Sequence, residues 1–252
     1  MQALMMTVLL AQPAELPDAQ QVVEAAIATM TESRARMEAL GVTYRKEVEK
    51  FDTSVEPRVL KEQAMWLMWY HEGSSYQQLI ERNGEPVPDA AVERVTKDAF
   101  DELPDRFEYS WNSEPIIESF GVRLYVIDIR PKKDAGKGFK SPQEKTLARM
   151  EGKLYVNIDG MFIQGLVAEL PESFRPIWPV LKVNSSFFVF RQAQVPLYRN
   201  GTEETIVVFD GAAAEFSVAF FGKQRDELHR YTYFGYQMFE DMPDTENTPP
   251  AR

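Results

Sequence analysis

The sequence predicts a mainly β protein of the α+β class, in which a strongly curved antiparallel sheet, or an incomplete β-barrel, is closed by two helices. Three observations predict this class. One amphipathic helix follows a short apolar N-terminal run, many aromatic-rich strand patterns follow the helix, and no βαβ alternation is present, which excludes a parallel doubly wound sheet. The composition, with 44% hydrophobic and 27% charged residues, fits a globular protein with a substantial core.

Residues 18–40 are predicted to form the amphipathic helix. Asp18 follows Pro17 and can accept hydrogen bonds as the N-cap. Gly41 stands where a left-handed residue is expected to end the helix. The apolar stripe recurs at spacings of three, four or seven residues, at Val23, Ile27, Met30, Met37 and Leu40.

Three strands are expected next, at 42–51, 62–71 and 75–82, and apolar and charged residues roughly alternate in the first. The second is apolar on both faces, so we expect it to be covered on both sides. The turn Asn83-Gly84 and the short intervals between the strands favour an antiparallel meander.

A second helix is predicted after Pro86 and Pro88, with Asp89 as its N-cap. Its apolar stripe consists of Val92, Val95, Ala99 and Leu103. The lysine-rich residues 131–153 are expected to form a long, mobile, basic crossover. The remaining strands are expected at about 106–111, 119–129, 154–159, 161–169, 183–192, 203–209, 213–221 and 228–236.

The chain is expected to have three parts. Residues 1–14 are predicted to be a signal peptide cleaved after Ala11 or Ala14, because their apolar run is far shorter than the about 20 residues that cross a bilayer. The basic residues that normally precede such a run are absent, as expected for a signal truncated at its start. Residues 18–240 form a single domain, and 241–252 a disordered tail. We therefore expect an exported protein of the bacterial periplasm that is not an integral membrane protein.

The charge and the residue types exclude several classes of function. The net charge of −11 argues against nucleic acid as a partner, because binding it needs a cationic face. The lack of cysteine excludes disulfides and thiolate metal sites. His71 and His229 have no second ligand at a metal-binding spacing, and no serine-hydrolase elbow or phosphate loop is present. We predict no enzyme, no cofactor and no metal; a hydrolase that uses scattered carboxylates is an alternative without a specific motif.

Large apolar side chains on the strands are the remaining candidates for function. The concave side of a curved sheet must be filled by its own side chains, by a helix or by a ligand. Aromatic rings and flexible methionine suit a cavity that accepts acyl chains of varied shape. The alternative is a filled core. The predicted cavity residues are Trp66, Met68, Tyr70, Leu124, Val126, Phe188, Phe190, Phe216, Val218 and Phe220.

The order of these features resembles the LolA/LolB family of outer-membrane lipoprotein carriers. Residues 75–95 resemble the family's strand, Asn-Gly turn and helix, and residues 148–163 resemble its strand pair. The positions that match this pair are Gly152, Leu154, Val156 and Asp159. The resemblance covers roughly residues 18–240 in organisation. It implies an incomplete antiparallel barrel closed by helices around a hydrophobic cavity for acyl chains, and it implies no particular contact residue.

We therefore expect a carrier or sensor that binds acyl chains, a lipoprotein or another hydrophobic ligand between the sheet and the helices. Its partner is then a lipid or an acylated protein. The alternative is a structural or protein-interaction module of the cell envelope with a filled core. In that case, the basic residues 131–153 and the acidic remainder of the chain orient an envelope protein partner.

Overall fold

The computed structural model describes residues 16–95, 103–135, 138, 141–177, 179–199 and 202–238. The predicted signal peptide and the predicted tail lie outside these residues. The helices are α1 (Ala19–Ala39), α2 (Leu103–Arg106) and α3 (Pro142–Leu147). The strands are β1 (Val42–Asp52), β2 (Val59–His71), β3 (Ser74–Arg82), β4 (Glu85–Pro86), β5 (Val92–Val95), β6 (Phe107–Ser119), β7 (Val122–Pro131), β8 (Glu151–Asn157), β9 (Phe162–Glu169), β10 (Phe174–Ile177), β11 (Leu181–Arg199), β12 (Thr202–Phe220) and β13 (Lys223–Met238).

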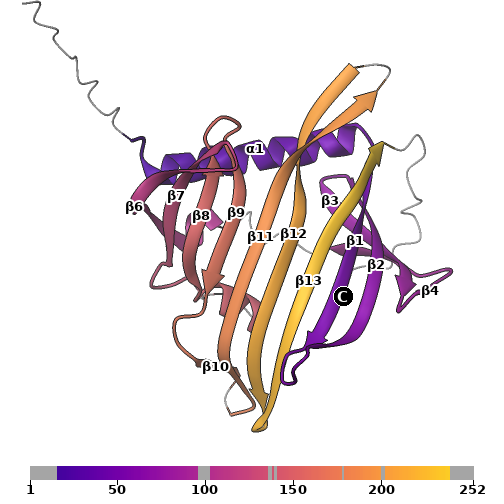
Figure 1. Ribbon diagram of the computed structural model, residues 1–252, viewed down its shortest axis with the longest axis vertical. Coiled ribbons are helices and arrows are strands. Elements are labelled where there is room, and N and C mark those ends of the chain that lie inside the picture. The colour runs from indigo at the N-terminus through magenta and orange to yellow at the C-terminus, as the bar shows by residue number, and fades with distance from the viewer. Residues whose placement is uncertain are drawn as a thin grey trace, which may run out of the picture.

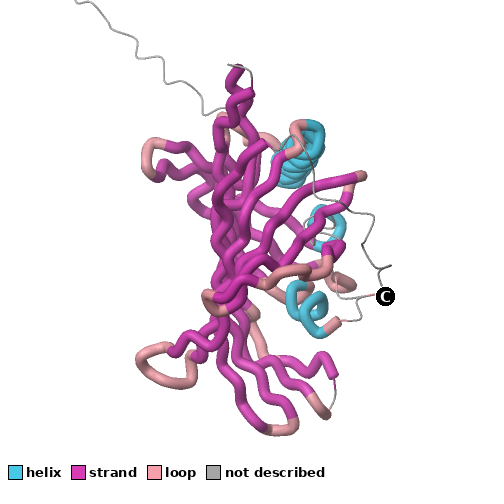
Figure 2. The backbone as a smooth tube through the Cα atoms, turned by 90° about the vertical axis from the view of Figure 1, so that its right-hand side faces the viewer, coloured by secondary structure: helices cyan, strands magenta, loops and turns pink. Residues whose placement is uncertain are grey.

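The strands of the described part of the chain form one antiparallel sheet of 13 strands. The main order is β4-β3-β2-β1-β13-β12-β11-β9-β8-β7-β6, while β5 joins β3 and β10 joins β11. The ends of this order, β4 and β6, do not pair with each other, so the sheet is open (Figure 1). Figure 2 shows that the helices lie on one side of the sheet. This confirms the predicted fold class, and that side is called the helix-covered face below.

Helix α1 confirms the prediction for residues 18–40. The carboxylate of Asp18 accepts the N–H of Gln21 at 3.1 Å, which satisfies one of the free donors of the first turn. Gly41 follows the helix with a φ of 62°, the left-handed conformation that its sequence position predicts. The helix runs across the strands rather than along them (Figure 1), so one helix reaches both halves of the sheet.

Two apolar clusters hold α1 against the sheet. The larger cluster packs Ala19, Val23, Ala26 and Met30 of the helix against strands β6 to β9 and β11. The smaller one packs Met37 against the start of β1 and against β11 and β12. Hydrogen bonds fix the two regions further: Trp111 Nε1 donates to the carbonyl of Pro17 at 3.0 Å, and the N–H of Val207 donates to Ser33 Oγ at 2.7 Å. The helix is thus attached near both ends, and the stretch between them spans the middle of the sheet.

The second predicted helix is wrong in its first turn. Residues Val92–Val95 form β5, which pairs with β3. β-branched residues at both ends of this segment favour a strand, and pairing with β3 outweighs the helical spacing of the apolar residues. Residues 96–102 lie outside the described part of the chain, and α2 begins after them at Leu103.

The predicted long basic crossover is also corrected, because α3 and the first three residues of β8 lie within residues 131–153. A capping box starts α3: Ser141 Oγ accepts the N–H of Glu144, and the Glu144 carboxylate accepts the N–H of Ser141. Lys132 and Lys145 each donate their ammonium to a backbone carbonyl of this chain. These two lysines therefore stabilise the fold of their own chain.

Two strand boundaries differ from the prediction. The strand predicted at 119–129 is divided by a turn at Phe120 and Gly121, whose φ angles are 52° and 77°. Phenylalanine rarely adopts a left-handed conformation, so the sequence pattern did not indicate a turn at this position. The strands predicted at 203–209 and 213–221 form one long strand, β12, because the chain continues through their junction in extended conformation.

Candidate functional site

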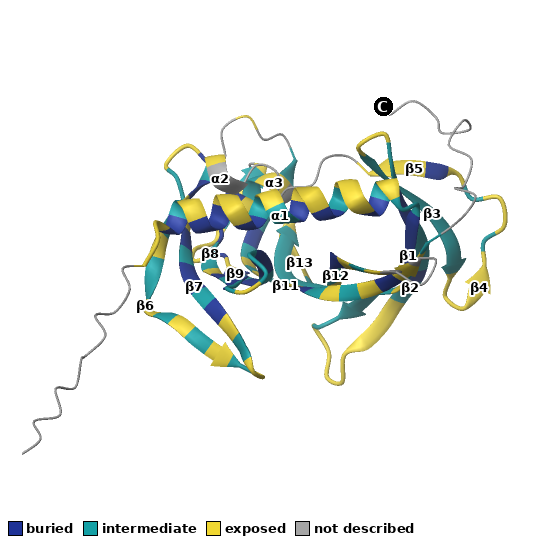
Figure 3. Ribbon diagram, turned by 90° about the horizontal axis from the view of Figure 1, so that it is seen from above, coloured by how far each residue is buried: buried dark blue, intermediate teal, exposed yellow. Residues whose placement is uncertain are grey.

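A cavity with a volume of about 1140 Å³ lies between α1 and the helix-covered face. Its floor consists of side chains from β1, β2, β11, β12 and β13, and its roof belongs to α1. Figure 3 shows α1 passing over the curved sheet with its buried residues turned towards the strands. Pockets for small molecules usually measure about 300–1,000 Å³, so this cavity is large enough for a long ligand.

The roof is a second stripe of α1. The side chains of α1 that line the cavity are Ile27, Thr31, Arg34, Ala35 and Glu38. They recur every three or four residues and therefore share one helix face. The neighbouring stripe, which includes Val23, Ala26 and Met30, is buried in the larger apolar cluster. One stripe thus attaches the helix to the sheet, while the other stays available to a ligand.

The β2–β3 turn closes one side of the cavity. The carboxylate of Glu38 accepts the N–H of Gly73 at 3.1 Å, which ties the end of the roof to this turn. Gly73 has a φ of 68°, a conformation that residues with a side chain rarely adopt. Arg94 and Val95 of β5 continue this wall. The wall is mostly polar, whereas the floor is apolar apart from Lys46.

Small residues at the centre of the floor leave room for the cavity. Ala212 and Ala214 of β12 line it and lie opposite Phe190 and Phe188 of β11, respectively. On the other side, Ala212 lies opposite Tyr231 of β13. A row of alanines between two rows of large rings forms a trough, because neighbouring strands are only about 4.8 Å apart. The larger side chains form the walls of this trough.

Tyrosines form the end of the floor near β1. The ring of Tyr44 stacks on that of Tyr236 at a centroid distance of 4.9 Å and also contacts the rings of Tyr70 and Tyr233. Tyr236 Oη donates to the carbonyl of Phe209 at 2.6 Å. Burial raises the pKa of Tyr44 and Tyr236 well above 10, and neighbouring tyrosines add to the shift. These phenols therefore stay neutral at physiological pH.

Alkaline pH is expected to destabilise the protein through this cluster. A tyrosine whose pKa is raised by folding keeps its proton above pH 10, whereas the unfolded chain loses it, so stability falls as the pH rises above about 10. For Tyr44 the loss is about 1.4 kcal/mol per pH unit. Urea unfolding at pH 10 and pH 11 measures it. We expect a smaller loss in Tyr44→Phe than in the wild type, and an unchanged loss in Tyr198→Phe, since Tyr198 is exposed. Equal losses in all three proteins would contradict the assignment.

The structure brings four of the ten predicted cavity residues together in the lining. These are Met68, Tyr70, Phe188 and Phe190. Trp66 lies next to the lining, where its ring contacts the ammonium of Lys46. Phe216 and Val218 follow Ala214 on the same face of β12, beyond the lining. Whether any of these residues binds a ligand stays a prediction.

The other three predicted residues lie away from the cavity. Leu124 and Val126 are buried, but they alternate with Ile127 and Ile129, which pack under α1, and therefore point to the opposite face of β7. Phe220 is 54% exposed at the β12–β13 turn. Several lining residues were not predicted: Tyr44, Phe209, Ala212, Ala214, Tyr231 and Tyr233. The two-residue spacing of Tyr231 and Tyr233 indicates that both rings lie on one face of a strand and could have predicted them. The alanines have no feature in the sequence that marks them as lining residues.

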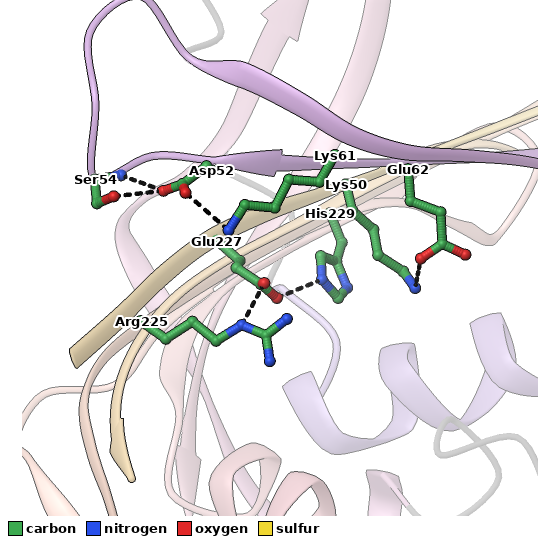
Figure 4. A network of polar contacts seen from close by, with 8 residues as sticks. All are labelled: Lys50, Asp52, Ser54, Lys61, Glu62, Arg225, Glu227 and His229. Carbon is green, nitrogen blue, oxygen red and sulfur yellow. Dashed lines mark hydrogen bonds and ion pairs between the residues drawn. The ribbon is translucent and has the colours of Figure 1, made fainter. Parts of the chain in front are cut away.

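A polar network continues the helix-covered face beyond the aromatic floor (Figure 4). The ammonium of Lys50 lies 2.7 Å from the Glu62 carboxylate, which lowers the pKa of that carboxyl group. Glu227 contacts both Arg225 and His229. Each of these charged side chains therefore has a partner of opposite charge, which indicates that the network stabilises the sheet.

Neither a metal site nor a membrane-spanning helix is found in the described residues. No group of three or more His, Asp or Glu side chains in that part of the chain is placed to hold a metal ion. No helix there is long and apolar enough to cross a membrane.

The chain was compared with protein families, curated proteins and solved structures, and only solved structures are similar to it. No family model and no curated protein matches the sequence. Among solved structures, a LolA superfamily protein from Nitrosomonas europaea is similar with a TM-score of 0.42 and 11% identity over 93% of this chain and 99% of that chain. A DUF1329 family protein from Desulfovibrio piger has a TM-score of 0.33 and 10% identity over 87% and 95%. MucB in complex with MucA(peri) has a TM-score of 0.27 and 6% identity over 86% and 94%.

A LolA superfamily protein is thus among the structures that this chain is similar to.

Proposed function

We propose that this chain is an exported, non-enzymatic carrier or sensor of the bacterial periplasm, which holds acyl chains or another hydrophobic ligand beneath α1. The cavity of about 1140 Å³ is the observation that supports this most directly. Its floor offers apolar area from phenylalanine, tyrosine, methionine and alanine, and burial of apolar area contributes about 25 cal/mol per Å². A lipid or an acylated protein is the partner that such a floor accepts.

A filled core would not leave this space. Protein interiors are normally packed as densely as organic crystals, with few voids larger than a water molecule. Two apolar clusters pack α1 against the sheet, with Ile27 at the edge of the larger one, while Thr31, Arg34, Ala35 and Glu38 line the open volume. The unpacked stretch is therefore confined to one place, as in a binding site.

Native mass spectrometry of the protein purified without detergent tests this proposal. We expect an adduct with the mass of a lipid or an acylated peptide, or uptake of a fatty acid added afterwards. A clean apo mass, with no uptake of fatty acids or phospholipids, would contradict the carrier and favour a module that binds envelope proteins through its outer surface.

A further inference from the structure

Lys46 places a cation within the aromatic floor of the cavity. It lies on β1 between Trp66 of β2 and Tyr233 of β13, its partners in the sheet. Its Nζ lies 5.5 Å from the centre of the Trp66 ring and donates to Oε1 of Gln77 at 2.6 Å. The ammonium is thus held in one orientation by an aromatic face and a neutral amide.

A comparison with Lys50 shows what Lys46 lacks. Lys50 lies on the same face four residues further along β1, and its ammonium meets the Glu62 carboxylate at 2.7 Å. At Lys46, the neutral side chain of Gln77 takes the place of a carboxylate, and the amide of Gln77 donates to Glu93 at 2.9 Å. Within the described residues, Lys46 has no ion pair. This is notable in a chain with 39 acidic residues, where a carboxylate partner is easily supplied.

Lys46 is partly buried, and removing a cation from water without a paired anion is unfavourable. Burial lowers the pKa of Lys46 to about 8, and the charge of Glu93 acts in the opposite direction. An ammonium has three N–H donors. One of them is used by Gln77 within the described part of the chain, so the others can bind an incoming acceptor. An anion at this point would compensate the charge.

We propose that the ligand is an amphiphile with an oxyanion head, a carboxylate or a phosphate, and that Lys46 binds this head. The inference rests on the proposed function, because the apolar tail must lie along the trough of Ala212 and Ala214. The other charged residues of the lining are Arg34, Glu38, Arg94 and Glu144. Arg94 donates to Ser74 and Glu38 accepts from Gly73, so both take part in the side wall. Lys46 differs from them because it belongs to the floor.

Three ligands with the same twelve-carbon chain separate the head from the tail: laurate, dodecyl phosphate and uncharged methyl laurate. Each is titrated, below its micelle concentration, against bound N-phenyl-1-naphthylamine, an uncharged hydrophobic dye. We expect laurate or dodecyl phosphate to bind about tenfold more tightly than methyl laurate, a difference of about 1.4 kcal/mol. The better of the two anions identifies the head as carboxylate or phosphate.

Variants assign the effect to Lys46. Lys46→Met is expected to weaken binding of the anionic ligands about tenfold, leaving methyl laurate unchanged. Lys46→Arg should retain the preference for the anion, which also guards against a folding defect in the first variant. Lys50→Met is the matched control and should behave like the wild type.

The outcomes separate this inference from the proposed function. Equal affinity of the wild type for laurate, dodecyl phosphate and methyl laurate would overturn the inference while supporting the cavity. A preference for the anions that survives in Lys46→Met would also overturn it, since another residue would then hold the head. If neither the dye nor any of the three ligands binds, the proposed function fails and the inference fails with it.

Discussion

Replacing both Ala212 and Ala214 with phenylalanine is expected to weaken ligand binding about tenfold or more while the protein stays folded. The two alanines form the trough of the floor, and rings at these positions would stand where the ligand lies. Each methylene that loses its apolar contact costs about 0.8 kcal/mol. If the two rings displace about two methylenes, the loss is about 1.6 kcal/mol, which exceeds a factor of ten in affinity. Displacement of N-phenyl-1-naphthylamine by laurate measures the change.

Ala213→Phe is the matched control for this variant. Ala213 lies between the two alanines on β12, pairs with Val189 and Arg230, and points to the opposite face of the sheet. We expect its affinity for laurate to equal that of the wild type. Unchanged affinity in the double variant, with a native melting transition, would show that the ligand does not bind in this cavity.

Much of the fold could be predicted because it follows from local patterns. The cap at Asp18, the stripe of α1 and Gly41 define one helix within a few residues. The first turn of the second predicted helix was wrong because Val92–Val95 pairs with β3, and the helical spacing of Val92 and Val95 is weak evidence against that pairing. A tertiary contact, which no local pattern contains, decided the structure of this segment.

The cavity was harder to predict than the fold. Sequence alternation identifies two faces of each strand, but it does not say which face α1 covers. Leu124 and Val126 were therefore assigned to the cavity although they point away from α1, while Met68 and Phe188 lie in its lining. The space itself comes from Ala212 and Ala214. Their small side chains leave a trough only because neighbouring strands place large rings beside them, which the sequence does not show.

Lys46 is another feature that the sequence hid. In the predicted strand 42–51 it shares a face with Val42, Tyr44 and Val48, and a lysine among apolar residues normally extends its ammonium to water. The structure instead gives that face to the cavity, and it pairs Lys50 but not Lys46 with a carboxylate within the described residues. The difference between two lysines four residues apart depends on β2 and β3, which cross-strand pairing brings beside them.

Gly152→Ala is expected to cause the largest loss of stability among single methyl additions to the described glycines. A Cβ at this position of β8 would lie 2.0 Å from the carbonyl oxygen of Val167 and 2.7 Å from Cα of Ala168. Both atoms belong to the backbone of β9, so no side-chain rotation relieves the clash, and the two strands must move apart. Overpacking of this kind costs typically about 1–3 kcal/mol, and we expect the upper end. Urea unfolding measures the free energy.

Gly211→Ala is the control, because its new Cβ would meet the carbonyl oxygen of Tyr231 at 3.4 Å, an ordinary contact. Both glycines lie inside strands, so the change in chain entropy is common to the two variants and cancels in their difference. We expect Gly211→Ala to alter stability by less than about 0.5 kcal/mol. A loss of similar size in both variants would show that β8 and β9 are not packed this closely.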